Sequence, residues 1–122
     1  MAKATIDSLL ATMAKNKRDT IQTLTVNGLE FTVNKLPITA VLNIMDEYGD
    51  STAEQFEMFK ELVYMSIPIF RDERLRAECD CKIPHDVVTE VLGDNLKVIS
   101  ELAKAITNMY NMNDEVEELK KQ

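Results

Sequence analysis

The residues best suited to chemistry lie close together in the second half of the sequence. Cys79 and Cys81 form a Cys-x-Cys pair, and His85, the only histidine, follows four residues after Cys81. Thiolates and imidazoles bind zinc, but a structural zinc site needs four ligands and commonly uses Cys-x-x-Cys spacing. The fourth ligand would have to be Asp80, Asp86 or a distant residue. We therefore predict no metal site, and a metal-binding or thiol-redox module is the least favoured hypothesis.

Catalytic motifs are equally hard to find. No Gly-x-Ser-x-Gly or comparable nucleophile motif accompanies His85, which follows a proline at the start of an expected helix. The three glycines, Gly28, Gly49 and Gly93, are isolated and cannot form a phosphate-binding loop. The acidic run at residues 114–118 is typical of a solvated surface. The sequence predicts no catalytic residue, no cofactor and no enzyme activity.

Charge and composition narrow the possible partners. The 122 residues carry a net charge of −7, which disfavours binding to nucleic acid phosphates or to an anionic membrane surface. Hydrophobic residues make up 45%, enough for a core, yet no apolar run reaches the roughly 18 residues of a membrane span. The first residues lack the apolar core of a signal peptide. We expect a cytoplasmic protein whose two cysteines are reduced.

A β-hairpin is the strongest local signal. Two Thr- and Val-rich segments, residues 22–26 and 29–33, alternate apolar with polar side chains around Asn27-Gly28. Asn-Gly favours a type I′ turn, which would pair the two segments directly. The turn puts four apolar side chains on one face, which must pack on helices or on a hairpin of another copy. We predict self-association through these residues: Leu24, Val26, Leu29 and Phe31.

Helical spacing dominates the rest of the chain. An N-terminal helix is expected over about residues 5–16, and Pro37, a Ser51/Glu54 capping box and Pro84 mark the starts of others. The fold class is therefore mostly α with one small β-hairpin (α+β), a compact domain of about five to six helices. We divide this single domain, residues 1–122, into a helix and hairpin at about 5–34, a helical body at about 37–112 and a charged flexible tail at about 113–122.

The last helix, expected from Asn95 to Met112, has an unusually wide apolar face. On a helical wheel its apolar residues fill an arc of about 200°, roughly twice what one core contact requires. We infer that this helix contacts its own core and also a second surface. Methionine side chains adapt to varied apolar partners. The predicted partner-binding residues are Leu102, Ala105, Met109 and Met112.

The order of these elements and several short segments resemble a known family. The hairpin is followed by KLPI at 35–38, ELVYMSIPIFRDERL at 61–75, KIPHDVV at 82–88 and a long final helix. In style and order, most strongly over about residues 61–110, this is similar to the small tail assembly chaperones of long-tailed bacteriophages and prophages of Gram-positive hosts.

The resemblance implies a function without catalysis. Such proteins bind the long apolar tape measure protein in the host cytoplasm, keep it soluble, and are displaced by tail tube subunits, so they are not expected in the mature virion. They self-associate, and in many relatives a ribosomal frameshift makes a longer form that recruits the tube protein.

An alternative function remains open: a small helical regulator, such as an anti-repressor or antitoxin-like protein that blocks one target. A regulator would form one tight complex, whereas a chaperone would bind several apolar helical segments weakly.

Overall fold

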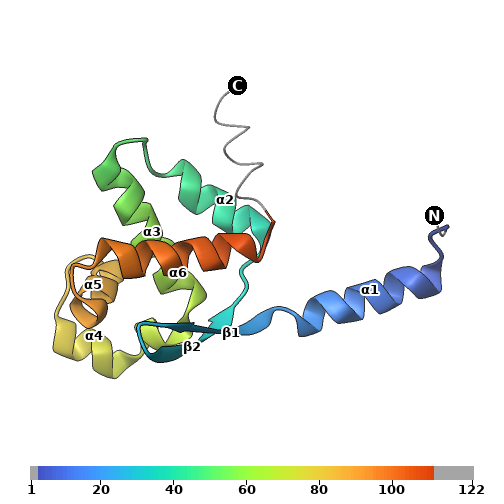
Figure 1. Ribbon diagram of the computed structural model, residues 1–122, viewed down its shortest axis with the longest axis horizontal. Coiled ribbons are helices and arrows are strands. Elements are labelled where there is room, and N and C mark those ends of the chain that lie inside the picture. The colour runs from blue at the N-terminus through green and yellow to red at the C-terminus, as the bar shows by residue number, and fades with distance from the viewer. Residues whose placement is uncertain (1–2, 112–122) are drawn as a thin grey trace.

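A computed structural model describes residues 3–111 of the chain (Figure 1). Within that range the fold consists of helices and one antiparallel hairpin, so the predicted α+β class is confirmed. The elements, with η for 3₁₀ helices, are α1 (Ile6–Arg18), β1 (Ile21–Val26), β2 (Leu29–Asn34), α2 (Ile38–Asp46), α3 (Thr52–Ser66), η1 (Pro68–Arg71), α4 (Glu73–Cys79), η2 (Pro84–Asp86), α5 (Val87–Leu92) and α6 (Leu96–Asn108).

The hairpin forms as the Asn-Gly signal predicts. Asn27 and Gly28 both have positive φ angles, 56° and 76°, which a two-residue type I′ turn requires. Leu24 pairs with Phe31, and Val26 pairs with Leu29. The turn residues thus set the register, and the register places the apolar side chains on one face.

That apolar face packs on the chain's own helices. Phe31 and Val33 are buried, and the Phe31 ring stacks on Phe70 of η1 with centroids 5.6 Å apart. β1 lies against α6, and β2 lies against η1. A two-stranded ribbon is marginal alone, so this contact with helices provides the burial that holds it in place.

Proline and capping residues set the helix boundaries. Ser51 caps α3, because its hydroxyl accepts a hydrogen bond from the Glu54 backbone N–H. The Glu54 carboxylate accepts from the Ser51 hydroxyl and from the Gly49 backbone N–H at 2.8 Å, and so secures the turn before the helix. Pro68 follows the end of α3 and opens η1, since proline cannot continue the hydrogen-bonded ladder of a helix.

The core lies where α3 and α6 pack against each other (Figure 1). One hydrophobic cluster joins these two helices to the hairpin, η1 and α5, and a second joins α2 to α3. Tyr110 connects the two clusters, and its hydroxyl donates a 2.8 Å hydrogen bond to the Leu36 carbonyl. The chain leaving α6 is thereby held beside the chain entering α2.

Helix α6 bears on two predictions. It ends at Asn108, before the expected Met112, which lies outside the described residues. Its wide apolar arc is covered by the chain itself, because α3 packs on it together with β1 and α5. The hairpin and α5 account for the second surface inferred from the sequence, although Leu96 of α6 is 53% exposed, and contact of α6 with a partner stays a prediction.

Helix α1 lies apart from this core. It extends away from the hairpin, and its N-terminal end is far from the other helices (Figure 1). None of its residues is buried. Four large apolar side chains are 49–73% exposed on this one helix, whereas the exposed large hydrophobic residues of the body are spread over several elements.

The turn conformation allows a direct test of the hairpin. Replacing Asn27→Ala together with Gly28→Val should lower the free energy of unfolding by about 1–3 kcal/mol, because both positions have positive φ. No atom lies within 4 Å of a Cβ built at Gly28, so this cost is conformational and not steric. Urea denaturation measures it. Gly28→Asn, which tolerates positive φ, is the control, and an equal loss in that variant would contradict the explanation.

Candidate functional site

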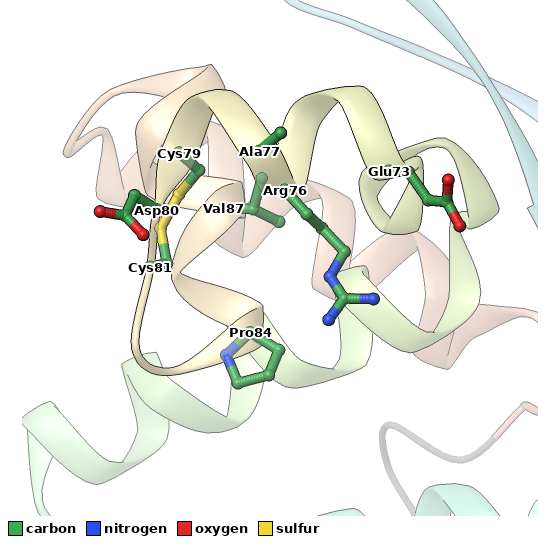
Figure 2. Close-up of a pocket in the computed structure, with 8 residues that line it drawn as sticks. All are labelled: Glu73, Arg76, Ala77, Cys79, Asp80, Cys81, Pro84 and Val87. Carbon is green, nitrogen blue, oxygen red and sulfur yellow. A yellow bond between two sulfur atoms is a disulfide. The ribbon is translucent and has the colours of Figure 1, made fainter.

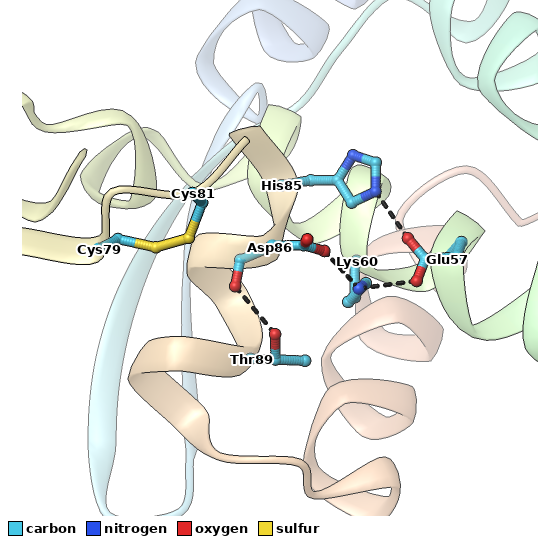
Figure 3. A network of polar contacts seen from close by, with 7 residues as sticks. All are labelled: Glu57, Lys60, Cys79, Cys81, His85, Asp86 and Thr89. Carbon is cyan, nitrogen blue, oxygen red and sulfur yellow. Dashed lines mark hydrogen bonds and ion pairs between the residues drawn. A yellow bond between two sulfur atoms is a disulfide. The ribbon is translucent and has the colours of Figure 1, made fainter. Parts of the chain in front are cut away.

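The structure separates the residues that the sequence placed together. The His85 ring points toward α3, whereas Cys79 and Cys81 lie on the other side of the η2 segment (Figure 3). His85 Nε2 is 2.8 Å from Glu57 Oε2. The Cys-Cys-His trio considered for zinc is therefore not assembled in this fold.

His85 instead belongs to a polar network between α3 and η2 (Figure 3). Lys60 Nζ lies 2.8 Å from Glu57 Oε1 and 2.6 Å from Asp86 Oδ1, so one ammonium bridges two carboxylates. The Lys60 side chain is only 6% exposed, and it also lies over the Phe56 ring, 5.6 Å from the centroid. The network joins segments that are distant in the sequence. Lys60 and Asp86 are 26 positions apart, and Glu57 and His85 are 28 positions apart.

The charged groups of this network stabilise one another's charged forms. Burial alone would raise the pKa of Glu57, but hydrogen bonds from Lys60 and His85 outweigh burial and lower it. Burial likewise would lower the pKa of Lys60, and hydrogen bonds to Asp86 and Glu57 raise it instead. Both groups therefore favour their charged forms, which is typical of an ion-pair network that stabilises a fold.

The chemistry open to this network is limited. Glu57, His85 and Asp86 offer ligand atoms within 4.8 Å of one another, a donor set that suits a divalent cation. The Lys60 ammonium already supplies a positive charge between two of these three groups. The hydrogen bond described for His85 joins it to a carboxylate and not to a hydroxyl or thiol nucleophile. The arrangement fits a structural role better than catalysis.

The cysteines differ from expectation. The sequence predicts reduced thiols, but the structure joins Cys79 and Cys81 in a disulfide around Asp80. Helix α4 ends at Cys79, and Asp80 follows in a left-handed conformation. The Cα atoms of the two cysteines come to 5.3 Å, within the range that disulfides span.

A pocket of about 300 Å³ lies beside this disulfide (Figure 2). Its charged lining residues, Glu73, Arg76 and Asp80, are exposed. Water therefore already solvates these groups, and they do not form a dry binding site.

A carboxyl outside the polar network, that of Glu61, lies within α3. Burial raises the pKa of Glu61, and Tyr48, whose own pKa is raised by burial and by its hydrogen bond to Glu61, faces it. Glu61 Oε2 is buried without a hydrogen-bond partner among the described residues. Neither Glu61 nor Tyr48 lines the pocket beside the disulfide.

The predicted interaction residues are largely covered. Leu102 is fully buried, and Ala105 and Met109 are half-buried on α6, while Met112 lies outside the described residues. The Leu102 prediction therefore conflicts with its place in the core, where α3 covers it.

The hairpin residues predicted to mediate self-association are also mostly covered. Phe31 is buried, Leu24 and Val26 are half-buried, and Leu29 near the turn is 49% exposed. This face packs on the chain's own helices, so only its tip is available to a second copy.

The most distinctive free surface is a stripe on α1, which we call the α1 stripe. It consists of four residues with helical spacing and large exposed side chains: Ile6, Leu9, Leu10 and Met13. Two shallow pockets continue it toward the body, one of about 370 Å³ beside Met13 and one of about 430 Å³ beside Leu36 and Ile38. Both pockets are lined by Asn16 and Thr20, so they adjoin each other at the C-terminal end of α1, which we call its base.

The sequence showed the α1 stripe but not its exposure. Its spacing predicts an amphipathic helix, which ordinarily buries its apolar side in the core of its own domain. The polar network was missed because its partners are distant in the sequence. Only the Glu57–Lys60 spacing of three residues gives a local signal for that network.

Comparisons of the chain with protein-family models, with curated proteins and with solved structures find no match. Among residues 3–111, no helix has the length and apolar character needed to span a bilayer.

Removing the buried cation tests the structural interpretation of the network. Lys60→Met leaves Glu57 and Asp86 facing each other without a counter-charge, and it should lower the free energy of unfolding at pH 7 by about 1–2 kcal/mol. This estimate is modest because both carboxylates are more than one-third exposed and are partly screened. Chemical denaturation of both proteins measures the loss.

The loss should depend on pH. The lowered pKa of Glu57 contributes stability that is present above the ordinary glutamate pKa and disappears as the pH falls through its lowered value. Protonation also relieves the repulsion in the variant, so the difference between the proteins should shrink from pH 7 to about pH 4. Lys104→Met, on the exposed side of α6, is the control. A loss of equal size at both pH values would contradict the interpretation.

Proposed function

We propose that this protein is a tail assembly chaperone of a long-tailed phage or prophage, which binds the tape measure protein and keeps it soluble without catalysing a reaction. The sequence segments that resemble this family, at about residues 61–110, form the central helices of the fold. The proposal requires an apolar surface that is free to hold another chain.

The α1 stripe is the observation that carries this proposal. Its four side chains are 49–73% exposed, and the helix has no buried residue. Contiguous exposed apolar patches mark sites of interaction with another protein, a membrane or a ligand. The client-binding surface proposed here is therefore α1, in place of the α6 residues predicted from the sequence.

The mechanism follows from helix packing. A tape measure protein is a long helical chain with apolar stripes, and one such stripe would lie along the α1 stripe, as an amphipathic helix lies on an apolar surface. The overall charge of −7 then keeps coated segments apart in solution. Several copies of the chain can bind along one long client, and tube subunits that bind the client more tightly would displace them.

This function would be carried out in the host cytoplasm, before the tail tube forms around the tape measure protein. The chaperone leaves as the tube assembles, so it would be absent from the mature virion. The partners are the tape measure protein and the tail tube protein, and the function needs no cofactor, nucleic acid or membrane.

Co-expression with the tape measure protein of the same genome tests the proposal. The tape measure protein should be largely insoluble alone and should become soluble in the presence of the chain. Leu10→Asp puts a charge on the α1 stripe and should abolish this effect. Ala11→Asp adds the same charge to the opposite side of the helix, at another exposed residue, and should retain it.

Two outcomes would count against the proposal. If the native chain leaves the tape measure protein insoluble, the chaperone function is wrong. If both variants solubilise it as well as the native chain does, α1 is not the client-binding surface.

A further inference from the structure

We propose that the α1 stripe is covered by the same stripe of a second copy of this chain, with the two α1 helices antiparallel. The inference goes beyond the proposed function, because it concerns the protein alone and holds whatever its client is. It stands on the isolation of α1, on the order of charges along it and on the pockets at its base.

The first observation is that α1 is isolated from the core of its own chain. An amphipathic helix normally gains most of its stability from packing its apolar side, and a helix of 13 residues is marginal alone in water. The capping box satisfies the backbone N–H groups of Thr5 and Ser8 through each other's hydroxyls, but it buries no apolar surface. The α1 helix therefore needs a cover that the rest of its own chain, as far as it is described, does not supply.

The spacing of the apolar residues fits an antiparallel copy. When two α1 helices are centred on residue 11, Leu9 of each lies opposite Met13 of the other, because these residues are equally far from the centre. Leu10 completes the apolar contact next to them. Ile6 of one copy then lies opposite Asn16 of the other, beyond the last apolar residue of the stripe.

Charge order supports the same arrangement. The start of α1 carries Asp7, and its end carries Lys15, Lys17 and Arg18. Asp7 and Arg18 share one flank of the helix, whereas Lys17 lies at the end of the apolar stripe, so antiparallel pairing brings each Asp7 within about one turn of Arg18 of the other copy. Parallel pairing would instead place like charges beside each other.

The base of α1 extends this contact surface. The two pockets that adjoin at Asn16 and Thr20 lie where Ile6 of the second copy would arrive. The pocket nearer the body is lined by Leu36, Pro37 and Ile38, and Ile38 is 45% exposed. The N-terminal turn of one copy can therefore bury its apolar side chain against the other copy's body.

The overall shape permits this pairing. Because α1 projects away from the core (Figure 1), a two-fold axis through its centre leaves the two acidic bodies at opposite ends of the helix pair. Bodies of like charge are then held apart while the apolar stripes meet. A client helix that needs the α1 stripe would compete with this pairing, so the dimer would be the form present without a client.

Sedimentation equilibrium of the purified chain, without any client, tests the pairing. We expect a reversible monomer–dimer equilibrium in the micromolar range, typical of a small interface. Leu9→Asp should weaken dimerisation at least tenfold, whereas Ala11→Asp should change it less than threefold. Neither variant should change the thermal unfolding of the body, because α1 has no buried residue. A native chain that stays monomeric at several hundred micromolar overturns the inference, as does equal dimerisation of the two variants.

Charge reversal tests the antiparallel orientation. Asp7→Lys should weaken the dimer, because it places a positive charge near Arg18 of the other copy. Adding Arg18→Asp should restore much of the affinity, since the new charges attract across the antiparallel pair. If the double variant is as weak as Asp7→Lys alone, the antiparallel arrangement is wrong. Dimerisation is measured without a client, so a failure to dimerise leaves the proposed function standing. A failure to solubilise the tape measure protein likewise leaves the proposed dimer standing.

Discussion

The packing of α6 against α3 is the contact on which the rest of the fold depends. Three residues of α6, Ile99, Leu102 and Ile106, are fully buried, and the hairpin and α5 close over the parts of α6 that α3 leaves free. Hydrophobic burial of this kind is the main favourable term in folding. The hairpin, η1 and α5 all bury their apolar residues in the same cluster, so their positions follow from this helix pair.

The same packing explains why α1 is left outside. The exposed residues of α6 are polar apart from Leu96, and the hairpin directs its apolar side toward the helices, so the apolar surface of the body beside α1 lies mainly in the small pocket lined by Leu36, Pro37 and Ile38. The fold therefore contains two amphipathic helices in opposite situations. One is enclosed by its own chain, and the other extends into solvent with its stripe uncovered by the described chain. The uncovered stripe of α1 is therefore the part of the fold that the proposed binding of another chain would use.

Local signals in the sequence predicted local structure well. Asn27-Gly28 determined the turn and the register of the hairpin, and Ser51 and Pro68 marked the ends of α3, because each effect acts within a few residues. Contacts between residues far apart in the sequence were not predictable in this way. A wheel shows that α1 and α6 are both amphipathic, but which one the core encloses depends on contacts far apart in sequence. The pairing of His85 with Glu57 across 28 residues has the same origin.

The central claim is that α1 gains its cover from another chain and not from its own. Hydrogen exchange of the α1 backbone amides at several protein concentrations measures this most directly, with the α6 amides as an internal reference. The account predicts fast exchange in α1 at low concentration and slower exchange as concentration rises, while α6 stays protected throughout. Protection of α1 equal to that of α6 at the lowest concentration would show that α1 packs on its own body, and would contradict the account.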